Sequence, residues 1–202
     1  MKITIMCEGR TERGFKPCLH GFLRGRLAGK MPSLKFDVHD GSIPTEGKLK
    51  RVVKNLLDTD ARRSDVVIAL TDVYPAFADA ETAKQQMREW VGDEPKFHPH
   101  VALHDFEAWL LPHWDRIQGL AGRKSKPFGA DPEKVNRNNP PAHRLAALFE
   151  AGDCRDSYHK IRDAARILKD ADLMVSIEAC AELKAFVNTI LRVCGGKKAM
   201  IA

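Results

Sequence analysis

Four acidic side chains stand where apolar, strand-like runs of this 202-residue chain should stop. Glu8 follows KITIMC, Asp72 ends DVVIALTD, and Asp105 and Glu107 follow KFHPHVAL. Mg²⁺ and Mn²⁺ prefer hard oxygen ligands, and a site normally takes one or two carboxylates together with water and substrate phosphates. Carboxylates at neighbouring strand ends therefore predict a site for Mg²⁺ or Mn²⁺.

The same four acids have a purely structural interpretation. Asp and Glu stabilise the N-terminus of a helix by accepting its free backbone N–H groups and by opposing the helix dipole. Each acid here stands between a strand-like run and a helical pattern, which is where such a residue belongs. Residue type and spacing leave both interpretations open.

The apolar pattern of the first 121 residues predicts four repeats of a strand followed by a helix. The strands are expected at 2–7, 34–38, 65–72 and 96–103, and the helices from Thr11, near 49–57, near 79–91 and after Phe106. Because Pro17 lacks a backbone N–H, the regular first helix is expected to begin only near it. The repeats predict an α/β fold with a small parallel sheet flanked by helices. Ligands bind outside the carboxyl ends of such strands, where Glu8, Asp40, Asp72 and Asp105 stand.

The remaining residues differ in pattern. Residues 122–141 are basic and rich in Gly, Pro and Asn, which predicts an exposed excursion. Helical spacing follows at about 142–150, 156–169 and 173–194, and the last eight residues are expected to fray. We therefore predict an α/β core at 1–121 and, at 122–202, a loop and a mostly helical C-terminal extension packed on that core.

Composition favours a basic cytoplasmic protein. Lys and Arg number 33 against 27 Asp and Glu, a formal net charge of +6 that favours an anionic partner such as nucleic acid. The N-terminus lacks a signal-peptide pattern and no stretch is long and apolar enough for a membrane helix. Five scattered cysteines without a C-x-x-C spacing predict buried thiols in a reducing compartment.

Four stretches, in this order, resemble one branch of the Toprim superfamily: CEGRTERGF, VVIALTDVYPAF, HVALHDFEAWLL, and DPEKVNRNNPPAHRLAALF followed by SYHK. Members of that branch have E-G-x-T-E after the first strand, D-x-Y-x-x-P after the third and L-H-[DE]-F-E-A after the fourth. The set spans residues 3 to about 195. The superfamily includes topoisomerase and primase catalytic domains and nucleases of anti-phage systems.

This resemblance implies a Toprim-like fold and a nuclease that uses Mg²⁺ or Mn²⁺ to cleave phosphodiester bonds. Glu8 and Asp72 would hold the metal, and Asp105 or Glu107 would complete its shell. Genes of the branch often lie beside one for an ABC-type ATPase. The resemblance therefore implies the effector subunit of an ATPase-linked anti-phage system, with nucleic acid as substrate, DNA rather than RNA.

One position departs from the usual Toprim motif. The usual D-x-D reads Asp72-Val73-Tyr74 here, so a second carboxylate is missing and tight binding of two metals is in question. Asp105 or Glu107 could replace it, or Tyr74 could position a phosphate through its hydroxyl group. The departure keeps two alternatives open: a non-catalytic subunit that binds nucleic acid or the ATPase, and a small Toprim ribonuclease that matures structured RNA.

Two further residues complete the predicted catalytic set of Glu8, Asp72, Glu107, His104 and Lys160. His104 would orient Glu107 or act as a general acid or base, and its structural alternative is a capping or buried, hydrogen-bonded histidine. Lys160 opens a late helix and would neutralise charge on a cleaved phosphodiester, unless it is an ordinary surface lysine.

A basic run on the second predicted helix has two interpretations. Its members are Lys48, Lys50, Arg51 and Lys54. They would contact a phosphate backbone, or they form the solvated face of a helix.

Overall fold

The structure is a computed structural model. It describes residues 1–9, 11–29, 31–39, 41–60, 63–127, 129, 131–134, 139–152, 157–195 and 200–202. Asp40, one of the predicted strand-end acids, and Cys154 lie outside the described residues.

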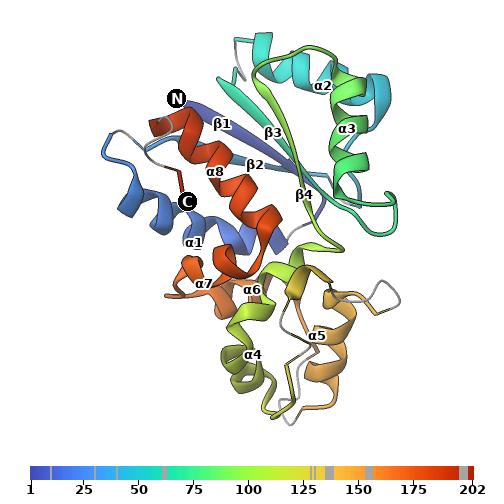
Figure 1. The fold of residues 1–202 in the computed structure, drawn as a ribbon, viewed down its shortest axis with the longest axis vertical. Coiled ribbons are helices and arrows are strands. Elements are labelled where there is room, and N and C mark those ends of the chain that lie inside the picture. The colour runs from blue at the N-terminus through green and yellow to red at the C-terminus, as the bar shows by residue number, and fades with distance from the viewer. Residues whose placement is uncertain are drawn as a thin grey trace.

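Four parallel strands form a sheet in the order β2-β1-β3-β4 (Figure 1). They are β1 (Lys2–Cys7), β2 (Ser33–Val38), β3 (Val66–Asp72) and β4 (Phe97–Ala102). The two central strands are buried almost throughout, because both of their faces are covered. Since every pairing is parallel, all four carboxyl ends lie at one edge of the sheet.

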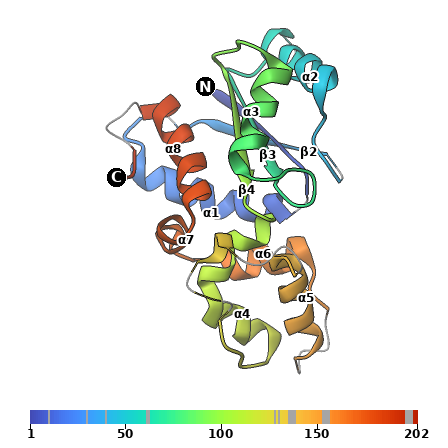
Figure 2. The same cartoon turned by 45° about the vertical axis from the view of Figure 1, so that its right-hand side comes forward.

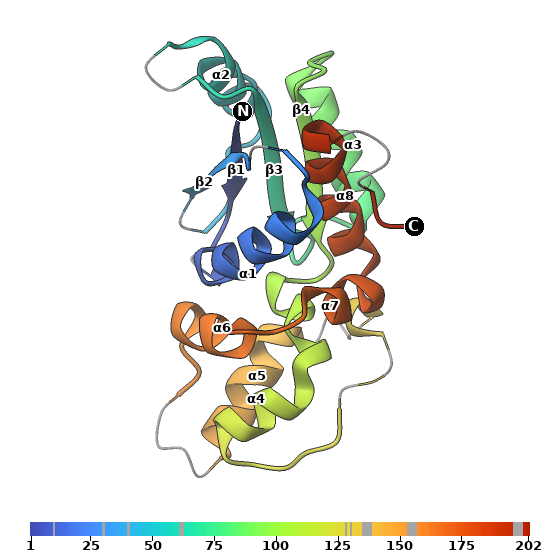
Figure 3. The same cartoon turned by 90° about the vertical axis from the view of Figure 1, so that its left-hand side faces the viewer.

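Helices cover both faces of the sheet (Figure 3). Alternate side chains of each strand point to opposite faces: Ile3 and Ile5 pack with α1 (Thr11–Arg26) and α8 (Ala181–Gly195). Met6 packs on the other side with α2 (Glu46–Asp58) and α3 (Ala80–Val91). Two hydrophobic clusters, one on each face, hold the sheet in place.

The segment between β4 and α8 is mostly helical and lies beyond the carboxyl edge of the sheet, whereas α8 itself packs on the sheet (Figures 1 and 2). Its helices are α4 (Trp114–Ala121), α5 (Pro141–Glu150), α6 (Lys160–Leu168) and α7 (Leu173–Ala179), with three short 3₁₀ helices, η1 (Phe106–Trp109), η2 (Leu111–His113) and η3 (Pro132–Lys134). Their apolar side chains join the cluster on the α1 face. The predicted fold class is confirmed, and the boundary between residues 121 and 122 stays a prediction.

Three predicted helices differ from the structure. The first begins at Thr11 and contains Pro17 in its interior, so the expected start near Pro17 was wrong. The Glu12 carboxylate accepts the N–H of Gly9 at 3.3 Å and supports the first turn. The helix expected after β4 is instead η1, η2 and α4 in succession, with Pro112 in η2. The single helix expected at 173–194 breaks at Cys180, whose backbone is extended.

Two segments expected to be exposed or frayed are held by tertiary contacts. Glu133, in the predicted excursion, is buried because it accepts hydrogen bonds from the Trp109 indole at 3.4 Å and from the Glu182 backbone at 3.1 Å. In the expected frayed tail, Ile201 donates to the Asn188 side chain at 2.7 Å and accepts from it at 3.0 Å. Residues 196–199 of that tail lie outside the described residues.

Gly14 sets the distance between α1 and α6. A Cβ at this position would lie 2.9 Å from the carbonyl oxygen of Ile161 and 3.0 Å from the backbone nitrogen of Ala165. Real Cβ atoms essentially never come within 3.0 Å of another heavy atom, and backbone atoms cannot move aside as a side-chain end can. The close approach of the two helices therefore depends on glycine.

We expect Gly14→Ala to lower the free energy of unfolding by about 1–3 kcal/mol, because it overpacks this contact. Gly21→Ala is the matched control in the same helix: a Cβ there meets no atom within 4 Å, and Ala favours a helix by up to about 1 kcal/mol. Urea denaturation of both variants measures the difference. A Gly14→Ala protein as stable as Gly21→Ala would show that the helices do not depend on this contact.

Candidate metal centre

Five carboxyl groups gather at the carboxyl edge of the sheet. Burial, and then repulsion from the other four carboxylates, Glu8, Glu107, Glu12 and Asp105, raise the pKa of Asp72 well above its ordinary value. Carboxylates that repel one another in this way lie close together in space. The structure thus brings together the four predicted metal ligands and adds a fifth acid, Glu12.

Glu8 and Asp72 come from the adjacent strands β1 and β3. The register pairs Cys7 with Leu70, which places Glu8 beside Thr71, and the Thr71 hydroxyl group donates a hydrogen bond to the Glu8 carboxylate. Burial raises the pKa of Glu8, while hydrogen bonds from Thr71 and from the Asp72 backbone oppose that rise. The Glu8 side chain is therefore held in place at the strand end.

Asp105 is only 7% exposed and has one oxygen that accepts no hydrogen bond from a described residue. Its Oδ2 accepts the N–H of Ala142, in the first turn of α5, at 3.1 Å, whereas its buried Oδ1 has no partner. Burial, and then repulsion from Glu107, raise the pKa of Asp105 to about 7 against the opposing effects of Ala142 and Lys160. Asp105 therefore keeps a buried acceptor atom for a further group.

Glu107 is 1% exposed, and one of its oxygens has several polar neighbours. Its Oε1 accepts from the Thr11 hydroxyl at 3.3 Å and from the Tyr158 hydroxyl at 3.4 Å. The Nζ of Lys160 lies 3.7 Å from the same oxygen. This attraction raises the pKa of Lys160, and burial followed by Glu107 raises that of Tyr158. Glu107 thus connects the sheet edge to α1 and α6.

Glu12 is a site residue that was not among the predicted ligands. It is 3% exposed, and its Oε2 is buried without a hydrogen-bond partner among the described residues. Burial raises its pKa to about 7, with repulsion from Glu107 and Glu8 adding to the rise. Glu12 is the last residue of the E-G-x-T-E motif, so the sequence did contain a signal for it. A glutamate in the first turn of a helix is equally typical of an ordinary helix start, however.

Two histidines of the fourth repeat, His104 and His100, have different environments. His104 has a φ of +69°, a left-handed conformation that is uncommon outside glycine and that concentrates at functional sites. Its carbonyl oxygen accepts the N–H of Tyr74 at 3.0 Å. His100 points instead to α8, where it contacts Thr189 at 2.9 Å and the ring of Phe186. Burial lowers its pKa to about 3, which marks it as a packing residue.

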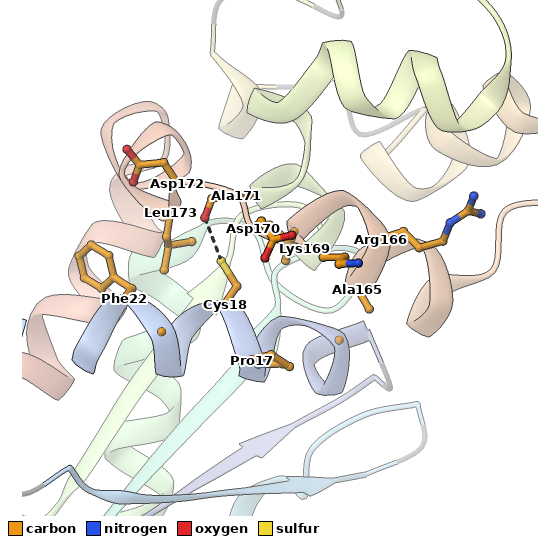
Figure 4. Close-up of a pocket in the computed structure, with 13 residues that line it drawn as sticks. Pro17, Cys18, Phe22, Ala165, Arg166, Lys169, Asp170, Ala171, Asp172 and Leu173 are labelled. Carbon is orange, nitrogen blue, oxygen red and sulfur yellow. Dashed lines mark hydrogen bonds between the residues drawn. The ribbon is translucent and has the colours of Figure 1, made fainter. Parts of the chain in front are cut away.

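A cavity of about 590 Å³ lies elsewhere, between α1 and the segment that joins α6 to α7 (Figure 4). Its walls include Pro17, Cys18 and Phe22 on one side and Lys169 and Leu173 on the other. None of the five clustered acids lines it. The cavity is therefore separate from the acid cluster.

Few of the described side chains at this edge could coordinate one divalent metal ion together. In the described ranges, no set of three or more His, Cys, Asp or Glu side chains is arranged to hold a metal ion together. Mg²⁺ needs only one or two carboxylates, with water and phosphate completing its shell. The partnerless oxygens of Glu12 and Asp105, and the shared repulsion that a cation would relieve, fit such an ion. Assignment of individual ligands stays a prediction.

The fold and this edge define an α/β protein with a four-stranded parallel sheet and an acidic cluster at the strand ends. The chain belongs to the family described as "Domain of unknown function (DUF4276)", which matches residues 7–191. No curated protein matches it. None of the described helices is long and apolar enough to cross a membrane.

Solved structures of two OLD proteins are similar to this chain. The C-terminal region of the Burkholderia pseudomallei OLD protein has a TM-score of 0.57 at 16% identity, covering 96% of this chain and 98% of that chain. The C-terminal region of the Xanthomonas campestris pv. campestris OLD protein, phased with iodine, has a TM-score of 0.48 at 16% identity over 93% and 95%. At this identity, the Burkholderia structure shows a common fold.

Without metal, the raised pKa values predict a protein that loses stability as pH rises. Glu12 and Asp105 ionise near their ordinary pKa values of 4.5 and 3.8 when unfolded but near 7 when folded. Their stabilising contribution is therefore complete below about pH 4 and is lost as pH rises through about 7. We expect Glu12→Gln, which cannot ionise, to gain stability relative to the wild type over this range by about 1–3 kcal/mol.

Urea denaturation at a series of pH values, with a chelator present, measures this difference. Asp58→Asn is the control, because Asp58 is exposed on α2. Adding Mg²⁺ at pH 8 should stabilise the wild type by mass action. A difference between Glu12→Gln and the wild type that does not change with pH would contradict the prediction.

Proposed function

We propose that this chain is a metal-dependent nuclease that cleaves phosphodiester bonds, acting as the effector subunit of an ATPase-linked anti-phage system. The cluster of five acids, with Lys160 beside it, is the observation that supports a nuclease activity. Acids alone would repel a phosphodiester, so this edge needs cations before it can bind one. The ATPase partner and the defence role are supported by the resemblance of the motifs to their Toprim branch.

Glu8 and Asp72 would hold Mg²⁺ or Mn²⁺, with Asp105 or Glu107 completing the set. Asp105 is the better candidate of the two, because its Oδ1 has no described partner while Glu107 Oε1 already accepts two hydrogen bonds and faces Lys160. Glu12 also has an available oxygen. When bound, the metal would activate a water molecule and stabilise charge on the phosphate.

Lys160 would bind the substrate phosphate. Its side chain is 58% exposed while its Nζ stays 3.7 Å from Glu107, so the ammonium group is held at the cluster yet open to solvent. The surrounding acids raise its pKa and keep it charged. A cation fixed in this way favours the negative charge that develops on a cleaved phosphodiester.

The basic face of α2 would contact the nucleic-acid backbone. Lys48, Lys50, Arg51 and Lys54 are all exposed, and none makes an ion pair within the part of the chain that the structure describes. The loop before α2 adjoins the acids, because the N–H of Gly41 donates to the Glu8 carbonyl at 3.3 Å. A nucleic-acid backbone that extends from the acids along the α2 face of the sheet would reach this helix, and we favour DNA over RNA.

A second candidate function is a non-catalytic subunit that binds nucleic acid or the ATPase through the same fold. The observation that favours it is Tyr74, which occupies the position of the second motif carboxylate. Such a subunit would bind nucleic acid without cleaving it. Cleavage assays therefore separate the two functions.

The metal is tested with Asp72→Asn. We expect calorimetry to show Mn²⁺ binding to the wild type and at least about tenfold weaker binding to the variant, equivalent to about 1.4 kcal/mol. Cleavage of plasmid DNA, with the ATPase added if required, should be lost in the variant. Asp58→Asn should bind metal and cleave as the wild type does. Wild-type metal binding without cleavage would favour the non-catalytic subunit, and unchanged binding by Asp72→Asn would remove Asp72 from the site.

The α2 contact is tested through salt dependence. Each phosphate contact adds about 0.9 to the slope of log affinity against log salt on duplex DNA. We expect Lys48→Ala/Arg51→Ala to reduce that slope by about 1.8, measured by fluorescence anisotropy. Lys16→Ala/Arg24→Ala is the control, since these cations are exposed on α1 across the sheet. Equal slopes for both double variants would show that α2 does not contact DNA.

A further inference from the structure

Tyr74 is an exposed aromatic side chain held beside the acid cluster. Its side chain is 38% exposed. Among the described residues its ring has no aromatic partner and its hydroxyl group no hydrogen-bond partner. A tyrosine that only packs would bury its ring, and a buried hydroxyl group would usually have a partner. The packing of the fold therefore does not account for the ring.

The backbone of Tyr74 is fixed although its side chain is free. The pairing between β3 and β4 continues beyond Asp72, because Val73 donates to the Ala102 carbonyl at 3.1 Å and Tyr74 to the His104 carbonyl at 3.0 Å. The accepting residue is the one with a left-handed backbone, at φ +69°. The left-handed turn after β4 thus helps to anchor the residue that carries the ring.

Tyr74 is also close to the proposed metal ligands along the chain and through the β3–β4 pairing. Tyr74 is the second residue after Asp72, and its backbone N–H is bound to the carbonyl oxygen of His104, the residue before Asp105. Two residues span at most about 7 Å of chain. A phosphate bound at Asp72 would therefore have the base of its own or the adjacent nucleotide within reach of this ring.

We propose that Tyr74 is a stacking platform for an unpaired nucleobase next to the scissile phosphate. This inference rests on the proposed function and specifies its substrate: a strand whose bases are accessible, and not a closed duplex. Aromatic side chains that stack on bases accept any sequence, since every base has a π-face. The face of the ring provides the contact, and the hydroxyl group is not required.

Four variants separate these contributions. Tyr74→Phe keeps the ring, Tyr74→Leu keeps apolar bulk without a ring, and Tyr74→Ala removes both. Val175→Ala, at an exposed apolar position on α7, is the matched control. Because position 74 is exposed, we expect all four proteins to fold, and thermal melts verify this.

The affinity of each protein is measured for short single-stranded DNA and RNA probes and for the matched DNA duplex. Ca²⁺ replaces Mg²⁺ in these binding measurements. We expect Tyr74→Leu and Tyr74→Ala to bind single strands about 5- to 100-fold more weakly, as expected for the loss of one stacked base. Duplex affinity should change by less than about twofold. The single-stranded probe carries 2-aminopurine, whose fluorescence should be quenched by the wild type and by Tyr74→Phe only.

Equal single-strand affinity of Tyr74→Leu and the wild type would overturn the inference, as would an equal loss on single strands and duplex. Loss of affinity in Tyr74→Phe would also overturn it, because the hydroxyl group would then carry the contact. If the wild type cleaves DNA and any of these results is found, the inference fails and the proposed function stands. If the wild type binds none of the probes, both fail.

Discussion

Repulsion among five carboxylates at one edge of a parallel sheet is the constraint around which this protein is built. Parallel pairing places every carboxyl end at the same edge, and the chain puts an acid at three of those ends within the described residues. Burial makes the repulsion expensive, because a charged group loses its hydration there. Hydrogen bonds donated to the acids offset part of this cost. The donors are the hydroxyl groups of Thr71, Thr11 and Tyr158 and the N–H of Ala142.

These donors show that the helical C-terminal part belongs to the site. Tyr158 and Lys160 stand at the start of α6, and Ala142 stands at the start of α5. Both helices are distant in sequence from the strands whose acids they contact. The close packing of α6 on α1 at Gly14 therefore matters beyond stability, because it holds Lys160 beside Glu107.

The cluster of buried acids lowers the stability of the folded protein. Glu12 and Asp105 each keep a buried oxygen without a described partner, which a protein selected only for stability would avoid. His104 has a left-handed backbone at the same edge. Departures from local rules that concentrate in one place are typical of functional sites. This edge has that character.

The sequence by itself determined the strand–helix repeats, the parallel sheet and the position of its acids, because alternation along a strand and helical spacing are local patterns. The local pattern at Pro17 led to a wrong start for the first helix. Contacts in the first turn of α1 outweighed the N–H that Pro17 lacks. Only the tertiary structure decided that Glu12 turns inward, that Lys160 faces Glu107 and that Glu133 is buried. Each of these depends on contacts between residues distant along the chain, whose packing outweighs local preference.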